Sequence, residues 1–142
     1  MIYGTYLSKL KEIPSNAVKI FIARQARPEI QESLKKYDCI WADIFGPSNE
    51  LRDDFKNKKI VWPRFVEDYI VEQSQLISHF TPKRVSMINV IKCAIDEGKD
   101  VYVICYEKDP LECHRTPFGH FIAVMFKTEY KEADFSENKN CS

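Results

Sequence analysis

The fold of this chain is decided by residues 100–106, which read Asp-Val-Tyr-Val-Ile-Cys-Tyr. The run is almost entirely apolar and rich in β-branched and aromatic residues, which is typical of a central strand buried on both faces. A helical pattern ends at Gly98, just before the run, and Thr116 and Pro117 are predicted to open another helix after it. A helix, a buried strand and a second helix predict an α/β fold, with a small, layered, mostly parallel sheet and helices packed on it.

The remaining elements follow from the same kind of pattern. Further strands are predicted at residues 2–6, 18–23 and 39–42, and helices at residues 7–13, 29–37, 49–55, 63–77 and 82–97. We expect one domain over residues 1–130, followed by a polar, disordered tail over residues 131–142. Arg24, Asp43 and Cys105 stand at or just beyond the ends of three strands. Because ligands of such sheets bind beyond the carboxyl ends of the strands, these residues indicate where a site would lie.

Composition excludes some classes of function. The chain has 142 residues, of which 44% are hydrophobic, and its 21 basic and 21 acidic residues cancel. Zero net charge argues against broad affinity for nucleic acid or membranes, and no apolar run approaches the roughly 18–20 residues of a membrane span. Without a signal peptide pattern at the N-terminus, we expect a cytoplasmic protein. A local basic pocket stays open, because six arginines could converge: Arg24, Arg27, Arg52, Arg64, Arg84 and Arg115.

The candidate functional residues lie between Cys105 and Thr116. Cys105 ends the buried strand, and Cys113, His114 and Arg115 come just before the predicted helix. A helix N-terminus attracts anions and lowers the pKa of a nearby thiol, and an arginine adds a forked donor suited to phosphate. The segment therefore predicts an anion site or an activated thiol, with Cys113, His114 and Cys105 as catalytic candidates.

Two other interpretations of these residues stay open. Cys105 could equally be an ordinary core residue, since reduced cysteine is often buried. Cys105, Cys113 and His114 are also acceptable zinc ligands. A tetrahedral site needs a fourth ligand, however, and the adjacent Cys113 and His114 are expected to point in different directions. We therefore assign no metal ligands from the sequence. The five cysteines form no CxxC pair, which argues against a disulfide framework and a zinc ribbon.

The same segment carries a resemblance to a known family. Cys105-Tyr106-Glu107-Lys108, followed by Cys113-His114-Arg115, resembles the signature of the domain of unknown function 488 family. Ile22-Ala23-Arg24 resembles its "SIAR" segment, and Pro47-Ser48 with Glu50-Leu51 resembles its "APSWEL" segment. The likeness covers residues 2–126.

The resemblance implies a small α/β fold with a shared pocket, and no agreed reaction. Two positions depart from the family pattern. Thr116 stands where many members have a histidine, which weakens any role for a second histidine. Asn49 replaces the tryptophan of the second segment, which would change the shape of the substrate site.

The leading hypothesis is a pocket for an anionic ligand containing a nucleotide or phosphate. The residues expected to bind this ligand are Arg24, Arg115, Ser48, Glu50, Tyr6 and Thr116. An enzymatic version adds a thiol at Cys113, or at Cys105 with His114 as its partner. The sequence identifies neither a cofactor nor an oligomeric state.

The alternative class is a protein-interaction module that binds through exposed Trp41, Trp62 and Phe80, although these aromatic residues fit a core better. Nucleic-acid binding ranks third, because no basic stripe is present.

Overall fold

The structure is a computed structural model that describes residues 1–78 and 81–136. Its centre is a five-stranded sheet in which every pair of neighbouring strands is parallel, in the order β3-β2-β4-β1-β5. The strands are β1 (Ile2–Tyr6), β2 (Val18–Phe21), β3 (Cys39–Trp41), β4 (Val101–Cys105) and β5 (Tyr130–Glu132). The helices are α1 (Pro28–Lys36), α2 (Asn49–Lys56), α3 (Trp62–Ser78), α4 (Pro82–Asp96) and α5 (Arg115–Met125), with short 3-10 helices η1 (Leu7–Glu12), η2 (Asp43–Phe45) and η3 (Pro110–Glu112). The α/β prediction is confirmed, and none of the described helices is long and apolar enough to cross a membrane.

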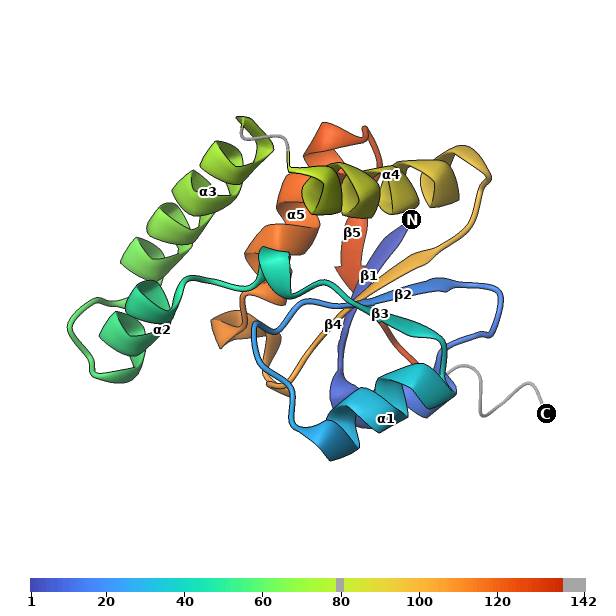
Figure 1. Ribbon diagram of the computed structural model, residues 1–142, viewed down its shortest axis with the longest axis horizontal. Coiled ribbons are helices and arrows are strands. Elements are labelled where there is room, and N and C mark those ends of the chain that lie inside the picture. Colours follow the sequence, from blue (N-terminus) through green and yellow to red (C-terminus); the bar gives the residue numbers. More distant parts are fainter. Residues whose placement is uncertain (79–80, 137–142) are drawn as a thin grey trace.

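The sheet separates two hydrophobic layers. Along β4, Val101 and Val103 face the layer built with α4 and α5, whereas Tyr102 and Ile104 face the layer built with α1 and η1. Figure 1 shows α1 on one side of the sheet and α4 and α5 on the other. All five residues of β4 are buried. The prediction of a central strand covered on both faces is therefore confirmed.

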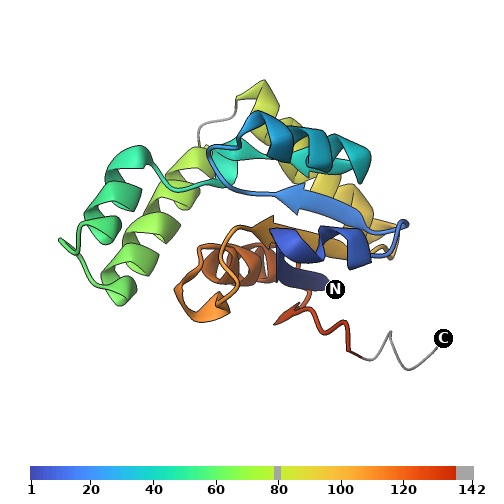
Figure 2. The same cartoon turned by 90° about the horizontal axis from the view of Figure 1, so that it is seen from below.

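A hairpin of α2 and α3 extends beyond the carboxyl edge of the sheet (Figures 1 and 2). Aromatic side chains hold it together: the ring of Phe55 lies 5.4 Å from Trp62 and 5.2 Å from Phe65. Tyr69 is fully buried and donates a hydrogen bond to the carbonyl of Phe45 over 2.5 Å, which ties α3 to η2. The hairpin therefore forms a fixed wall beside the ends of β2 and β4.

Two of the three aromatic residues expected at a partner surface are described, and both are half-buried. Trp41 donates from its indole N–H to the carbonyl of Ala23 over 2.8 Å, and Trp62 stacks on Phe65. Phe80 lies outside the described residues. Both rings are therefore packed against other parts of the chain, although Trp62 also lines a cavity.

The start of α5 lies two residues earlier than predicted. His114, not Thr116, is the N-cap, and the hydroxyl of Thr116 donates to the carbonyl of Pro110 over 2.7 Å. Pro117 is accommodated because the first-turn N–H groups of a helix have no partner within it, so a residue without an N–H loses nothing there. This two-residue difference decides where Arg115 points.

The C-terminal boundary is also different. Residues 131–142 were expected to form a tail, but Lys131 and Glu132 belong to β5, which pairs with β1 and forms one edge of the sheet. Phe135 is 8% exposed and packs in the layer with α1 and η1. The ordered domain therefore extends past residue 130, and residues 137–142 lie outside the described part of the chain.

Cys39 on β3 should resist alkylation. Burial raises the pKa of this thiol from 9.0 to about 12, although the nearby Lys19 opposes the shift. Because the folded pKa is raised, any contribution of the protonated thiol to stability is complete below pH 9 and is lost as the pH rises toward 12. Iodoacetamide labelling followed by mass spectrometry at pH 8 should modify the exposed Cys93 at least ~10-fold faster than Cys39. Equal rates for the two cysteines would contradict this prediction.

Candidate functional site

The carboxyl edge of the sheet assembles the site. Cys105 is the last residue of β4 and is fully buried, while Arg24 follows the neighbouring strand β2. After β4 the chain turns through η3 and returns to the same edge, where Cys113 and His114 lead into α5. Residues from four separate parts of the chain therefore surround one point, once the α2–α3 wall is included.

Four side chains with chemically active atoms meet at this point: Cys105, Glu107, Cys113 and His114. One ligating atom from each lies within 4.8 Å of the others. Both thiols donate to the same carboxylate oxygen, Oε2 of Glu107, over 3.2 Å from Cys105 and 3.3 Å from Cys113. The Sγ atom of Cys105 also lies 3.5 Å from Nδ1 of His114. We call these four residues the Cys-Glu-His cluster.

The side chains of Cys113 and His114 converge, contrary to the expectation that they point apart. Cys113 has an extended backbone (φ −126°, ψ 134°), whereas His114 is already helical (φ −63°, ψ −14°). Neighbours in a continuous strand would point to opposite faces, but the change of conformation between these two residues turns both toward Cys105. The fourth possible metal ligand, which the sequence did not identify, is a carboxylate oxygen of Glu107. The sequence argued against a metal site because a fourth ligand was missing and because Cys113 and His114 were expected to point apart. The structure removes both objections.

The orientation of the His114 ring is fixed. Its Nε2 lies 3.0 Å from the carbonyl oxygen of Ile22, and because a carbonyl only accepts, we assign the ring proton to Nε2. The ring also makes an edge contact with Tyr69, at 5.7 Å between centroids. Burial lowers the pKa of His114, so the ring is neutral near pH 7. Nδ1 therefore keeps its lone pair and presents it to the cluster.

The electrostatics do not fit an activated thiolate at Cys105. Burial raises the pKa of Cys105 well above its ordinary value, and the neighbouring Cys113 and Glu107 raise it further. Burial acts to raise the pKa of Glu107 as well, but the hydrogen bonds from the two thiols and from a backbone N–H, together with the nearby His114, lower it overall. The cluster at neutral pH thus holds a protonated Cys105 thiol beside a carboxylate. The hypothesis that Cys105 forms an active thiolate with His114 is therefore not supported by its surroundings.

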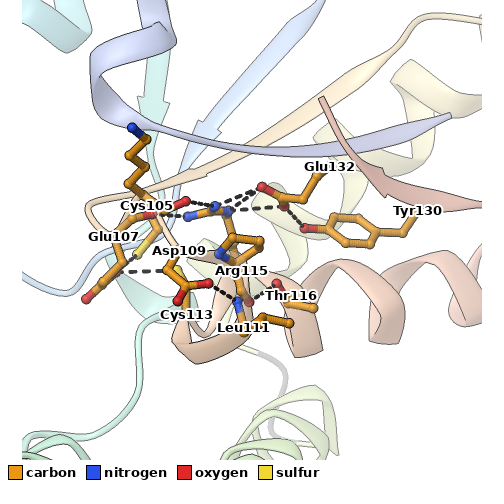
Figure 3. A network of polar contacts seen from close by, with 11 residues as sticks. Cys105, Glu107, Asp109, Leu111, Cys113, Arg115, Thr116, Tyr130 and Glu132 are labelled. Carbon is orange, nitrogen blue, oxygen red and sulfur yellow. Dashed lines mark hydrogen bonds and ion pairs between the residues drawn. The ribbon is translucent and has the colours of Figure 1, made fainter. Parts of the chain in front are cut away.

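The side chain of Arg115 points away from the Cys-Glu-His cluster and binds other groups of the protein, as Figure 3 shows. Its side chain is 0% exposed and pairs with the carboxylate of Glu132, with Nη2 2.8 Å from Oε1. The guanidinium also donates to the backbone carbonyls of Glu107 and Lys108, the second over 3.1 Å. Burial acts to lower the pKa of Arg115, but the bonds to Glu132 raise it overall, so the charge is permanent. The structure therefore gives Arg115 the task of holding residues 107–108 rather than clamping an anion.

The other residues predicted to bind a ligand are spread over the molecule. Ser48 caps α2 and donates from its hydroxyl to Glu72 over 2.5 Å, so its polar atoms are already engaged. Glu50 is exposed on the first turn of α2. Tyr6 lines a separate hollow near the C-terminal end of the described chain, and Thr116 lines a groove between α3 and α5. Among the predicted ligand-binding residues, Arg24 is the one that lies beside Cys105 and His114.

A cavity of about 450 Å³ opens over Cys105 and His114. It is lined by the basic residues Arg24, Arg27 and Arg52, and by the aromatic residues Phe55, Trp62, Phe65 and Tyr106. Phe55 was not predicted as a site residue, and Arg52 was named only as one of six arginines that could form a basic pocket. A signal for them existed, since they lie three residues apart on a helix whose N-cap was recognised, and such residues share a face.

The fold and the site define a class of protein: a small α/β domain with cysteine, histidine and glutamate side chains clustered at the carboxyl edge of a parallel sheet. Residues 5–125 match the family model DUF488-N3a, described as the Active DUF488-N3 subclade. The chain thus belongs to the domain of unknown function 488 family, as the Cys-Tyr-Glu-Lys and Cys-His-Arg segments indicated. No match to the chain was found among curated proteins or among solved structures.

Proposed function

We propose that this protein binds a small anionic molecule with a planar, partly apolar portion, such as a nucleotide, in the cavity over the Cys-Glu-His cluster. The observation that carries this proposal is the composition of the cavity wall. Three arginines and four aromatic residues line one hollow of about 450 Å³. Pockets for small molecules combine an apolar lining with a few polar groups in this way.

The arginines supply the charge complementarity. Arg24 is held by two neutral acceptors, donating to the carbonyl of Pro47 over 2.7 Å and to that of Gly46 over 3.0 Å. Arg27 and Arg52 each have a neighbouring carboxylate only at 3.8 Å, at the surface. Surface pairs of this kind contribute little, so a phosphate can compete for these guanidinium groups. The proposed site for the anionic group is therefore between Arg24 and Arg52, not at Arg115.

The aromatic wall supplies a surface for a ring. Trp62 lies nearly parallel to Phe65, with 5.0 Å between centroids and 14° between planes, and Phe55 packs against both. Such a preformed apolar surface favours stacking of a planar group. On the other side, Tyr106 is fixed by a hydrogen bond from its hydroxyl to the carbonyl of Gln25 over 2.7 Å.

An enzymatic role is part of the proposal. The matched family model is described as an active subclade. A ligand held by Arg24 and Arg52 would reach Cys105 and His114, which line the inner part of the same cavity. We place the reaction at the part of the cavity wall that these two residues form with Glu107, without giving Cys105 the role of a thiolate nucleophile. The Active description and the shared cavity are the support for this step.

Replacing Arg52 by alanine should weaken binding of a nucleoside phosphate by about 10- to 100-fold, as expected for loss of one charged hydrogen-bonding partner. Isothermal titration calorimetry with AMP, ADP and ribose 5-phosphate measures this, and quenching of Trp62 fluorescence reports stacking. Arg64→Ala is the matched control, because Arg64 is an exposed arginine paired with Asp68 on α3 and does not line the cavity. If none of the phosphate compounds binds, or if both variants bind like wild type, the proposed function is wrong.

A further inference from the structure

We propose that Cys105, Glu107, Cys113 and His114 bind one divalent transition-metal ion of the zinc class. The ligands would be the two Sγ atoms, a carboxylate oxygen of Glu107 and Nδ1 of His114. This inference goes beyond the proposed function and does not depend on it, since the cluster is complete without any bound nucleotide.

The spacing of the four atoms fits a tetrahedral ion. Zinc binds thiolate sulfur at about 2.3 Å and imidazole nitrogen or carboxylate oxygen at about 2.0–2.2 Å, so tetrahedral neighbours lie roughly 3.3–3.8 Å apart. Cys105 Sγ lies 3.2 Å from Oε2 of Glu107 and 3.5 Å from Nδ1 of His114, and Cys113 Sγ lies 3.3 Å from the same Oε2. These three separations are within a few tenths of an ångström of the required edges. The other three separations lie within 4.8 Å, so side-chain movements of up to about 1 Å would bring all four atoms to the distances that the ion requires.

The surroundings of His114 give an independent reason. Metal-bound histidines commonly donate their second ring N–H to a backbone carbonyl or a carboxylate, which fixes the ring and the free nitrogen. Here Nε2 donates to the carbonyl of Ile22 over 3.0 Å, and Cys105 Sγ lies 3.5 Å from Nδ1 and 3.6 Å from Nε2. The bond to Ile22 therefore leaves Nδ1 as the ring nitrogen with a free lone pair beside the thiols, and a rotation of the ring would aim that lone pair at the ion.

The remaining ligands are also placed by the chain. Arg115 donates to the backbone carbonyls of Glu107 and Lys108 and so holds the loop that carries the Glu107 ligand. Two thiolates and one imidazole select zinc, or a similar borderline-soft ion, over magnesium and calcium, which prefer oxygen ligands. Cys105 and Cys113 are buried, whereas Glu107 is exposed and lines the cavity. Glu107 is therefore the ligand that could leave and open a coordination position toward the cavity.

Titration of the full-length, reduced protein with Co²⁺ and Zn²⁺ tests the proposal. We expect one ion per chain by mass spectrometry of metal content. Co²⁺ should give a sulfur-to-cobalt charge-transfer band and the intense visible bands of tetrahedral cobalt. Cys113→Ser should remove about half of the charge-transfer intensity at saturating Co²⁺, because one of the two thiolate ligands is left. It should also weaken binding by at least about 100-fold, because loss of a ligand exceeds the 10- to 100-fold effect of losing an outer-shell partner. Cys93→Ser is the matched control, as Cys93 is exposed on α4.

A second pair of variants keeps both thiols. Glu107→Gln should weaken Zn²⁺ binding and alter the visible bands of bound Co²⁺, while Glu112→Gln, which changes another glutamate of the cavity wall, should not. The proposal is overturned if wild type binds neither ion stoichiometrically, if a Cys105–Cys113 disulfide forms in place of the complex under reducing conditions, or if Cys113→Ser binds as wild type does. Metal binding is measured without nucleotide and should be unchanged in Arg52→Ala. Failure of the metal site is thus separable from failure of the nucleotide pocket.

Discussion

Replacing Arg115 by alanine should lower the free energy of unfolding by about 3–5 kcal/mol, the range observed when one partner of a buried ion pair is removed. The side chain is fully buried and contacts three separate acceptors: the Glu132 carboxylate and the carbonyls of Glu107 and Lys108. The truncation removes the Arg115 donor from both carbonyls and leaves Glu132, which is 34% exposed, with the Tyr130 hydroxyl as its remaining donor, and a polar group that loses its partner away from water is unfavourable. Urea denaturation followed by circular dichroism measures the loss.

Two comparisons separate this explanation from a general effect of losing an arginine. Arg64→Ala removes an exposed pair with Asp68 and should change stability by no more than about 0.5 kcal/mol. Arg115→Lys keeps the charge but not the forked geometry, so it should recover only part of the loss. A cost below about 1 kcal/mol for Arg115→Ala would show that solvent, not Arg115, satisfies Glu132 and the loop carbonyls.

The sequence was sufficient for the elements whose pattern is local. The apolar run of β4 and the cap at Ser48 both appear in the structure where they were predicted. The direction of Arg115 was not accessible in the same way. A helix rotates by about 100° per residue, so a start at Arg115 in place of Pro117 turns the side chain from the expected cavity toward Glu132.

The partner of Arg115 was missed for a related reason. Glu132 lies in a polar segment whose short strand, β5, has no strong apolar alternation. Its order comes from tertiary contacts: pairing with β1, the ion pair to Arg115 and burial of Phe135. Composition alone assigns such a segment to a tail, because contacts between distant residues do not appear in a local pattern. The convergence of the Cys113 and His114 side chains could not be predicted either, because it depends on the change of backbone conformation between these two residues.

Replacing Gly119 by alanine should destabilise the protein by about 1–3 kcal/mol, although alanine normally favours a helix interior over glycine. Gly119 lies in α5, where β5 crosses the helix. A Cβ atom there would lie 2.2 Å from Cε2 and 2.3 Å from Cδ2 of the Tyr130 ring. The ring must then move, and its hydroxyl, which donates to Oε2 of Glu132 over 2.7 Å, would lose that contact (Figure 3). The absence of a side chain at Gly119 is therefore what lets the last strand reach Arg115.

A double-variant cycle tests whether the effect of Gly119→Ala on stability changes sign when the Tyr130 ring is removed. In a Tyr130→Ala background the obstacle is gone, so adding Gly119→Ala should stabilise the protein by about 0.5–1 kcal/mol through helix propensity. Gly98→Ala is the control: no atom lies within 4 Å of its added Cβ, but its φ of +74° disfavours alanine, so its cost should be the same in both backgrounds. If Gly119→Ala is equally unfavourable with and without the Tyr130 ring, crowding against β5 is not the cause. If the sign reverses, Tyr130 is held against α5 by the space at Gly119. The order of residues 130–132, and with it the pairing of Glu132 to Arg115, then depends on one missing methyl group.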